Sequence, residues 1–281
     1  MGYRLRGLRL SSLAAVCLVA MMGWQAVGRA EDRAGWMRQA RWGVMTHFLA
    51  DWIAGTGGEP MTVEKWNALI DGFDTEALAA QLEAAGAGYY LSPNATYDRF
   101  VGITPSKLSR RDLVADLAAS LQKRNIKLLV YLPSGAPNGD GVAKQALAWQ
   151  NGPVRNAEFQ RKWEAIIREW SQRWGTRVAG WWFDGCYWPN TMYRTSEGPN
   201  FASFAAAARA GNPGSALAFN PGVLYRTISI TPEDDYVAGE VDKPDQIQIK
   251  RTSDGKVDGV QVHMLSFLGT QWGRGTPRFT A

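Results

Sequence analysis

Short apolar runs alternate with longer amphipathic segments through the middle of the chain. The runs have the length of strands and are apolar on both faces, which is typical of strands buried in a parallel sheet. The segments between them carry apolar residues at helical spacing. The predicted strands are 41–49, 88–93, 127–134 and 178–184, and the predicted helices are 74–85, 109–126 and 156–174. This alternation predicts successive βα units of an α/β fold.

The same rhythm continues, with weaker signals, toward the C-terminus. A helix is expected at 201–210, and further strands are expected at 216–220, 235–240 and 260–268. Seven strands in a chain of 281 residues favour an α/β fold of the (β/α)8-like TIM barrel type. An eighth βα unit is not visible, so either the count is one short or the barrel is incomplete at its C-terminal end.

The first thirty residues have the pattern of a secretory signal. Arg4, Arg6 and Arg9 form a basic start, a mostly apolar stretch follows, and small residues occur near Ala30. The expected organisation is a signal peptide at 1–30 and one barrel domain at 31–281, in a secreted or periplasmic protein. The alternative is an uncleaved membrane anchor, although the apolar run is short and interrupted.

Removal of that segment changes the charge balance, because it carries four Arg and no acidic residue. Of 31 basic residues, 27 remain against 26 acidic ones. No Lys/Arg-rich stripe is left, so neither nucleic acid nor, after cleavage, a membrane is an expected partner. Cys17 leaves with the signal, and Cys186 is expected to be a small buried thiol without a disulfide partner.

One carboxylate occupies a special position in the predicted sheet. The run V-A-G-W-W-F-D-G-C-Y from Val178 is apolar until Asp184, which closes the strand. In a parallel barrel the carboxyl ends of the strands form the catalytic face, so Asp184 is a candidate catalytic group. The alternative is an Asp that caps a helix or opens a turn. Trp181 and Trp182 must point to opposite sides of the strand, and a flat ring beside an acid suits a sugar.

Other catalytic chemistries lack their residues. The chain has only two His, His47 and His263, and no cluster at metal-ligand spacing, so neither a metal nor a cofactor is expected. Motifs of serine hydrolases, nucleotide hydrolases and dinucleotide-binding proteins are also absent from the sequence. His47, near the end of the first predicted strand, is a candidate for binding a ligand hydroxyl, and its alternative is a structural histidine.

Hydrolysis of a glycosidic bond requires two carboxyl groups. Glu240 lies where a later strand would end and is the candidate partner of Asp184. Asp51, Asp234 and Asp235 compete with it. The alternative for Glu240 is a solvated surface residue.

Four sequence blocks follow one another over nearly the whole mature chain. They are R-W-G-V-M-T-H-F from Arg41, D-L-V-A-D-L-A-A-S-L-Q-K-R-N-I-K-L-L-V-Y-L-P-S from Asp112, W-W-F-D-G from Trp181 and L-G-T-Q-W-G from Leu268. Together they resemble the catalytic barrel of the α-L-fucosidases of glycoside hydrolase family 29.

This resemblance implies a retaining double displacement that releases a terminal α-L-fucosyl or related residue from a glycan. It implies that Asp184 is the nucleophile and that Glu240, in D-Y-V-A-G-E, is the acid/base. The expected substrate-binding residues are His47, Trp52, Tyr97, Asp98, Tyr131, Trp182 and Trp272.

The chain departs from the family at the block that binds the fucose hydroxyls. A His-His-Asp-Gly-Phe block is replaced by T-Y-D-R-F at 96–100, which lacks both histidines. Because groups matched to sugar hydroxyls carry much of the discrimination between sugars, a sugar other than fucose is an alternative. Two further alternatives are a catalytically inactive carbohydrate-binding barrel and a lyase that pairs its acids with Lys243 or Tyr236.

Overall fold

The centre of the fold is a parallel sheet of five strands in sequential order. The computed structural model describes residues 32–47, 62–93, 110–135, 141–151, 155–186, 194–249, 256–257, 259–269 and 272. The five strands are β1 (Gly43–Met45), β2 (Tyr89–Pro93), β3 (Lys127–Pro133), β4 (Gly180–Asp184) and β5 (Ala216–Phe219). The α/β fold predicted from the sequence is therefore confirmed.

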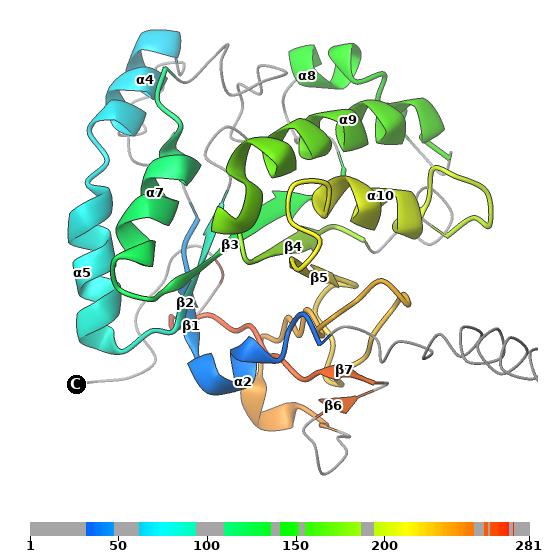
Figure 1. Cartoon of the computed structure of the whole chain (residues 1–281). Coiled ribbons are helices and arrows are strands. Elements are labelled where there is room, and N and C mark those ends of the chain that lie inside the picture. Colours follow the sequence, from blue (N-terminus) through cyan, green and yellow to red (C-terminus); the bar gives the residue numbers. More distant parts are fainter. Residues whose placement is uncertain are drawn as a thin grey trace, which may run out of the picture. The chain divides into compact units, whose positions relative to one another are not determined.

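Helices connect the strands and cover one side of the sheet. The helices are α2 (Trp36–Ala40), α4 (Val63–Asp71), α5 (Thr75–Ala85), α7 (Leu113–Gln122), α8 (Gly141–Ala146), α9 (Ala157–Trp174) and α10 (Phe201–Ala208), with 3-10 turns η1 (Gly175–Arg177) and η2 (Pro244–Gln246). Helices α5, α7, α9 and α10 lie on one side, whereas α2 and the chain after β5 lie on the other (Figure 1).

Local signals set the helix ends as expected. The side chain of Asp74 accepts a hydrogen bond from the backbone of Ala77 at 2.8 Å, and α5 ends at Gly86 with a left-handed φ of 75°. Asp112 caps α7 in the same way through the backbone of Ala115.

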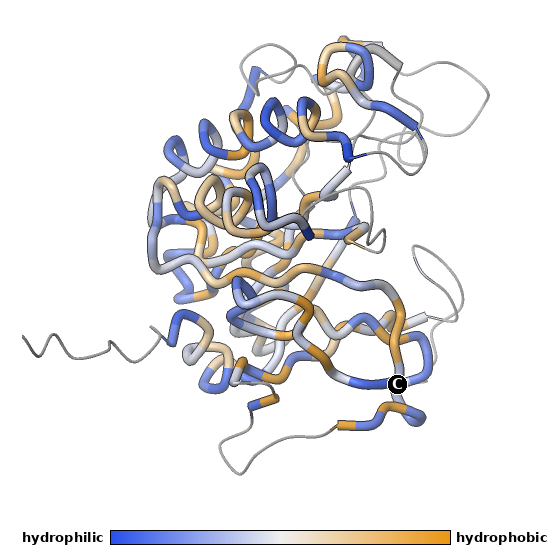
Figure 2. Tube along the Cα trace, turned by 90° about the vertical axis from the view of Figure 1, so that its right-hand side faces the viewer, coloured by the Kyte–Doolittle hydropathy of each residue, from blue (hydrophilic) through white to orange (hydrophobic). Residues whose placement is uncertain are grey.

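The strands bury two separate apolar layers, because successive side chains point to opposite faces. In β4, Trp181 and Phe183 belong to the large cluster under the helices. Trp182 belongs to a second cluster with Tyr89, Leu129 and other inward-facing residues of the barrel. Figure 2 shows the covering helices alternating between apolar and polar residues along their turns. The two tryptophans thus face opposite sides, as the alternation predicts.

The chain beyond β5 corrects two of the expected strands. Segments 235–240 and 260–268 are not continuous strands; they pair in parallel only at Tyr236 with Gln261 and at Glu240 with Leu265. Gly239 has a left-handed φ of 68°, which interrupts extended backbone, and a Cβ there would lie 2.1 Å from a carbonyl oxygen of the neighbouring segment. Val260–Gln261 forms β7, which pairs instead with β6 (Lys256–Val257) in an antiparallel hairpin.

These segments nevertheless continue the barrel order. The backbone N–H of Asp235 donates to the carbonyl of Leu217 in β5 at 2.8 Å, so segment 235–240 follows β5. Segment 261–265 comes next through its parallel bridges. Within the described residues no eighth strand joins this last segment to β1, and the barrel is not closed there.

Several other boundaries differ from the expectation. The first strand spans only Gly43–Met45, and the helices α2, α4 and α8 were not predicted. None of the helices that the structure describes is long and apolar enough to cross a membrane. The proposed signal at 1–30 lies outside the described residues and stays a prediction.

Candidate active site

Asp184 stands at the carboxyl end of β4 and accepts hydrogen bonds from Tyr131, Asn220 and Gly185. Its Oδ2 accepts from the hydroxyl of Tyr131 at 2.6 Å. Its Oδ1 accepts from Nδ2 of Asn220 and from the backbone N–H of Gly185, both at 2.8 Å. The Gly185 bond is the turn contact expected of an Asp that follows a strand. The other two donors come from β3 and from the residue that follows β5, so this carboxylate is held in one orientation at the end of the sheet.

Asn220 connects Asp184 to Glu240. The same Nδ2 atom that donates to Asp184 also donates to Oε2 of Glu240. This nitrogen lies 2.8 Å from one oxygen and 2.5 Å from the other, so those two carboxylate oxygens can be no more than 5.3 Å apart. Asn220 is fully buried, and its Oδ1 accepts from the backbone N–H of Gly222, which fixes which end of the amide faces the acids.

Glu240 is half-buried rather than a solvated surface residue. Burial raises its pKa above the ordinary value, and the nearby charge of Asp184 raises it further, whereas the hydrogen bond from Asn220 lowers it. The raised pKa favours the protonated form of Glu240. Such a pair can combine one acid and one carboxylate.

Aromatic rings surround this pair of carboxyl groups on the β3 side. Tyr131 stacks on Trp182 with ring centroids 5.5 Å apart, and His47 meets Tyr131 edge to face at 5.3 Å. The indole N–H of Trp182 donates to the carbonyl of Ala238 at 3.1 Å, which links β4 to the segment that carries Glu240. Three expected substrate-binding residues thus form one continuous aromatic wall next to Asp184.

His47 is open to solvent on one side, but burial of the remainder lowers its pKa. The charge of Asp184 acts in the opposite direction and is the weaker of the two effects. The imidazole is therefore neutral at pH 7 and can both donate and accept hydrogen bonds. Trp272 lies on the far side of a cavity from β1 and contacts Phe267 edge to face at 5.0 Å.

The competing acids have structural partners. Asp234 is buried and accepts hydrogen bonds from the backbone of Phe219 and the hydroxyl of Ser229. Asp235 forms an ion pair with Arg209 at 2.6 Å. The carboxylates of Asp234 and Asp235 therefore have structural partners of their own. Of the acids considered, the Asn220 amide joins Glu240 to Asp184.

The tyrosine of the lyase alternative, Tyr236, is engaged elsewhere in the barrel. Tyr236 is fully buried in the barrel, and its hydroxyl donates to the carbonyl of Trp181 at 2.9 Å. Burial raises its pKa well above the ordinary value, so this hydroxyl does not supply a base at the acid pair.

Four further candidates cannot be placed. Trp52, Tyr97, Asp98 and the competing acid Asp51 lie outside the described residues.

Cys186 is buried, and burial raises its pKa to about 12, as expected of an inert structural thiol. Among the residues that the structure describes, no three His, Cys, Asp or Glu side chains form a group that could hold a metal ion.

Asn220 is the site residue that sequence analysis missed. The available signal was its position as the last residue of the predicted strand 216–220, at the face where Asp184 also stands. The sequence Asn-Pro-Gly reads as a turn, and the structure does contain that turn, since Gly222 has a φ of 95°. One residue thus forms the turn and also contacts both acids.

Comparisons with known proteins reveal similarity of fold. No protein-family model matches the chain, and no curated protein matches it. Among solved structures, it is similar to the endo-fucoidan hydrolase MfFcnA4 from glycoside hydrolase family 107, with a TM-score of 0.62 and 18% identity. The H294Q form of that enzyme gives 0.56 and 20%. Both matches cover 88% of this chain and 46% of the other, so the chain spans about half the length of these structures.

The α-L-fucosidase AlfC from Lactobacillus casei in complex with its α-L-fucose product is also similar, at 17% identity over 75% of this chain and 74% of that one. Its TM-score is 0.48. The matches with the higher scores are to glycoside hydrolases, and at such low identity they show a shared α/β barrel fold and no more.

Proposed function

We propose that the chain is a glycoside hydrolase that acts by retention, with Asp184 as nucleophile and Glu240 as acid/base. The observation that carries the proposal is the shared Asn220 amide, which keeps the nearest carboxylate oxygens within 5.3 Å. Retaining enzymes separate their carboxyl groups by about 5–5.5 Å, whereas inverting enzymes need about 6.5–9.5 Å to admit a water molecule. The 5.3 Å limit applies to one oxygen of each carboxyl group, and this closeness supports direct attack by a carboxylate.

The local environments agree with these two roles. Asp184 attacks the anomeric carbon, while Glu240, whose raised pKa favours the protonated form, gives its proton to the departing glycosidic oxygen. Water then loses a proton to Glu240 and attacks the same carbon, which breaks the bond to Asp184. The sugar leaves with its original anomeric configuration, and both side chains return to their starting states.

The proposed substrate carries a terminal α-L-fucosyl or related residue. The resemblance to family 29 blocks supports it, as does the shared barrel of an enzyme named for hydrolysing fucoidan. The changed block at 96–100 is the reason to include related sugars. We further propose that the protein is exported. The test is N-terminal sequencing of protein recovered outside the cytoplasm: a start near Glu31 supports export with signal cleavage, and a different start contradicts it.

The test is hydrolysis of a panel of nitrophenyl glycosides that includes the α-L-fucoside. We expect release from the native protein and none from Asp184→Ala, while Glu83→Gln, a carboxylate on α5 that pairs with Arg124, retains activity. Proton NMR of the first-formed sugar reads its anomeric configuration and distinguishes retention from inversion. Full activity in Asp184→Ala contradicts the assignment of the nucleophile, and no hydrolysis by a folded native protein favours a carbohydrate-binding barrel.

A further inference from the structure

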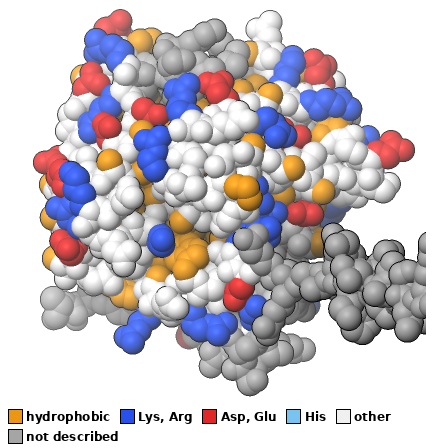
Figure 3. Space-filling model, in the orientation of Figure 1, with side chains coloured by type: hydrophobic (Ala, Val, Ile, Leu, Met, Phe, Trp, Pro, Cys, Tyr) orange, Lys and Arg blue, Asp and Glu red, His pale blue; other side chains and the backbone are white. Residues whose placement is uncertain are grey.

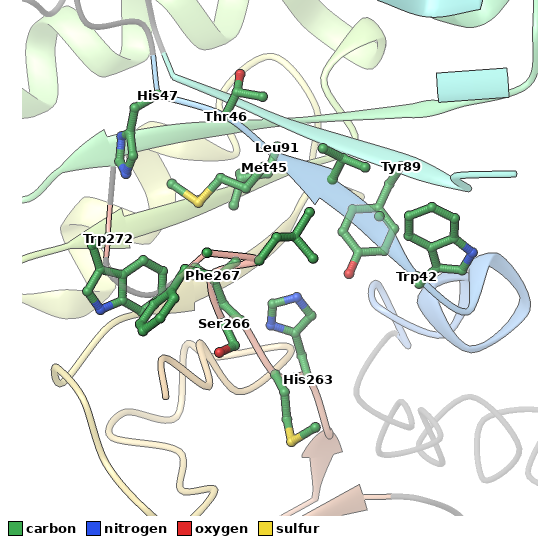
Figure 4. A pocket seen from close by; sticks show the side chains of 16 residues that line it. Trp42, Met45, Thr46, His47, Tyr89, Leu91, His263, Ser266, Phe267 and Trp272 are labelled. Carbon is green, nitrogen blue, oxygen red and sulfur yellow. The ribbon is translucent and has the colours of Figure 1, made fainter. Parts of the chain in front are cut away.

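A cavity of about 520 Å³ lies where the barrel is not closed. We call it the β1 slot. Residues 42–47, on and around β1, form one wall, and residues 263–269 with Trp272 form the opposite wall. Tyr89 and Leu91 of β2 complete it (Figure 4). The slot therefore lies between the first strand and the last described segment of the barrel, and its volume is within the range of small-molecule sites.

Rings dominate the walls of the slot. Four aromatic side chains and both histidines of the chain line it: Trp42, Tyr89, Phe267, Trp272, His47 and His263. They come from β1, β2 and the C-terminal segment and lie around one space (Figure 4). Flat rings are the protein groups that pack against the C–H faces of sugars, while Thr46, Ser266 and the histidines add uncharged hydrogen-bonding groups.

The slot carries no formal charge in its described lining. None of the sixteen described residues that line it is Asp, Glu, Lys or Arg. Burial lowers the pKa of His263 and of His47, so both are neutral at pH 7. Nδ1 of His263 lies 3.1 Å from the carbonyl oxygen of Ala238, to which it can donate a hydrogen bond. A neutral ligand suits this lining better than an anionic one.

The slot also gathers exposed apolar surface. Trp42, Met264 and Leu268 are 44%, 43% and 73% exposed, and all three line it. Charged side chains of both signs are, by contrast, interspersed over the face shown in Figure 3. Exposed apolar side chains grouped around one cavity mark a binding surface more often than isolated ones do.

The slot lies next to the acid pair. His47 lines the slot, and its ring contacts Tyr131, whose hydroxyl donates to Asp184. Glu240 pairs with Leu265, which lines the opposite wall. A ligand held at Asp184 and Glu240 therefore has a neighbouring space that begins at His47 and extends along β1 to Trp42.

We propose that the β1 slot binds additional uncharged sugar units of the glycan whose glycosidic bond lies at Asp184 and Glu240, so that the preferred substrate is an oligosaccharide. This inference rests on the proposed hydrolase function. The aromatic rings of the slot offer flat surfaces on which successive sugar units can pack. Charged substituents on these sugar units disfavour binding, because no described side chain in the slot compensates their charge.

The test compares a small and a large substrate in one variant series. Trp42→Ala removes a ring at the end of the slot remote from the acids. We expect it to lower kcat/KM about tenfold for neutral fucosylated oligosaccharides of three to five units. Its kcat/KM for the nitrophenyl α-L-fucoside should stay within about twofold, since that substrate does not extend along β1. Trp42→Phe should recover most of the loss, and Val63→Ala, an exposed apolar residue on α4, should lose nothing.

A binding measurement is independent of turnover. Calorimetry with Asp184→Ala should detect binding of the neutral oligosaccharides. The same compounds carrying sulfate esters should bind more weakly. The neutral compounds should also bind more weakly when Trp42→Ala is added to Asp184→Ala. Equal loss on both substrates, no loss on either, or tighter binding of the sulfated compounds overturns the inference even where the nitrophenyl glycoside is hydrolysed. A native dimer that Trp42→Ala dissociates also overturns it, in favour of a second chain in the slot. Failure of the function itself appears instead as no hydrolysis of any glycoside.

Discussion

Replacement of Asn220 by Ala tests the connection between the two acids. The substitution removes the amide that donates to Asp184 and to Glu240 without changing either carboxylate. Loss of a hydrogen bond to a charged group costs about 1.5–3 kcal/mol. We therefore expect kcat/KM to fall about 10- to 100-fold, since about 1.4 kcal/mol corresponds to a factor of ten.

The same substitution should move the pH profile. The Asn220 hydrogen bond lowers the pKa of Glu240, so its removal raises that pKa. The acid role proposed for Glu240 requires its protonated form, so activity should be lost as the pH rises through its pKa. The alkaline limb of the kcat/KM profile should consequently shift to higher pH in Asn220→Ala.

The assay is nitrophenyl glycoside hydrolysis between pH 4 and pH 9, with near-UV circular dichroism to verify the fold. Asn212→Ala is the matched control. Asn212 lies on the chain before β5, and its side chain donates to the carbonyl of Val178, away from the acids. We expect the control to retain the native alkaline limb. Activity within about twofold of native in Asn220→Ala, or a loss with no movement of that limb, refutes the coupling between the acids.

Three further predictions concern neighbouring residues. Tyr131→Phe removes the 2.6 Å hydrogen bond to Asp184 but keeps the aromatic ring, and kcat/KM should fall about tenfold; an unchanged value contradicts a role for the hydroxyl. Glu240→Gln should slow hydrolysis of oligosaccharides far more than that of nitrophenyl glycosides and abolish the alkaline limb, and equal effects on both substrates argue against general acid catalysis. Asp234→Ala leaves backbone donors such as the N–H of Phe219 unsatisfied, so urea unfolding should reveal a loss of roughly 3 kcal/mol or more, and a loss below about 1 kcal/mol contradicts this.

The sequence predicted the sheet and its helices well because local signals and burial agree there. Strand β4 is apolar on both faces, since one face packs under helices and the other fills the barrel. Asp74 and Gly86 mark the ends of α5 by hydrogen bonding and by a left-handed φ, both of which depend on residue type. The alternation along β4 also placed Trp182 on the same side as Asp184.

The C-terminal part of the barrel was less predictable. Segment 235–240 has strand-like composition, but the left-handed conformation of Gly239 and the close approach of the next segment divide it. Such a contact depends on residues far away in sequence, which local patterns do not contain. The β1 slot was invisible for the same reason, because its walls come from opposite ends of the chain.

Within the candidate site, the two acids were easier to single out from the sequence than the amide between them. Asp184 and Glu240 stood out as carboxylates at strand ends, whereas Asn220 carried only a turn signal. That Asn220 reaches both acids depends on its burial and on the acceptor role of its Oδ1 toward Gly222. Neither property is encoded in a short motif.

The strict alternation of β4 also limits how this protein can diverge. Phe183 must fill the helix layer and Asp184 must reach the mouth of the barrel, although the two are adjacent in the chain. A single-residue insertion or deletion within β4 would exchange the two faces, directing the carboxylate under the helices and an aromatic ring toward the mouth of the barrel. Homologues of this protein should therefore vary β4 by substitution, while changes in length accumulate in the loops on either side.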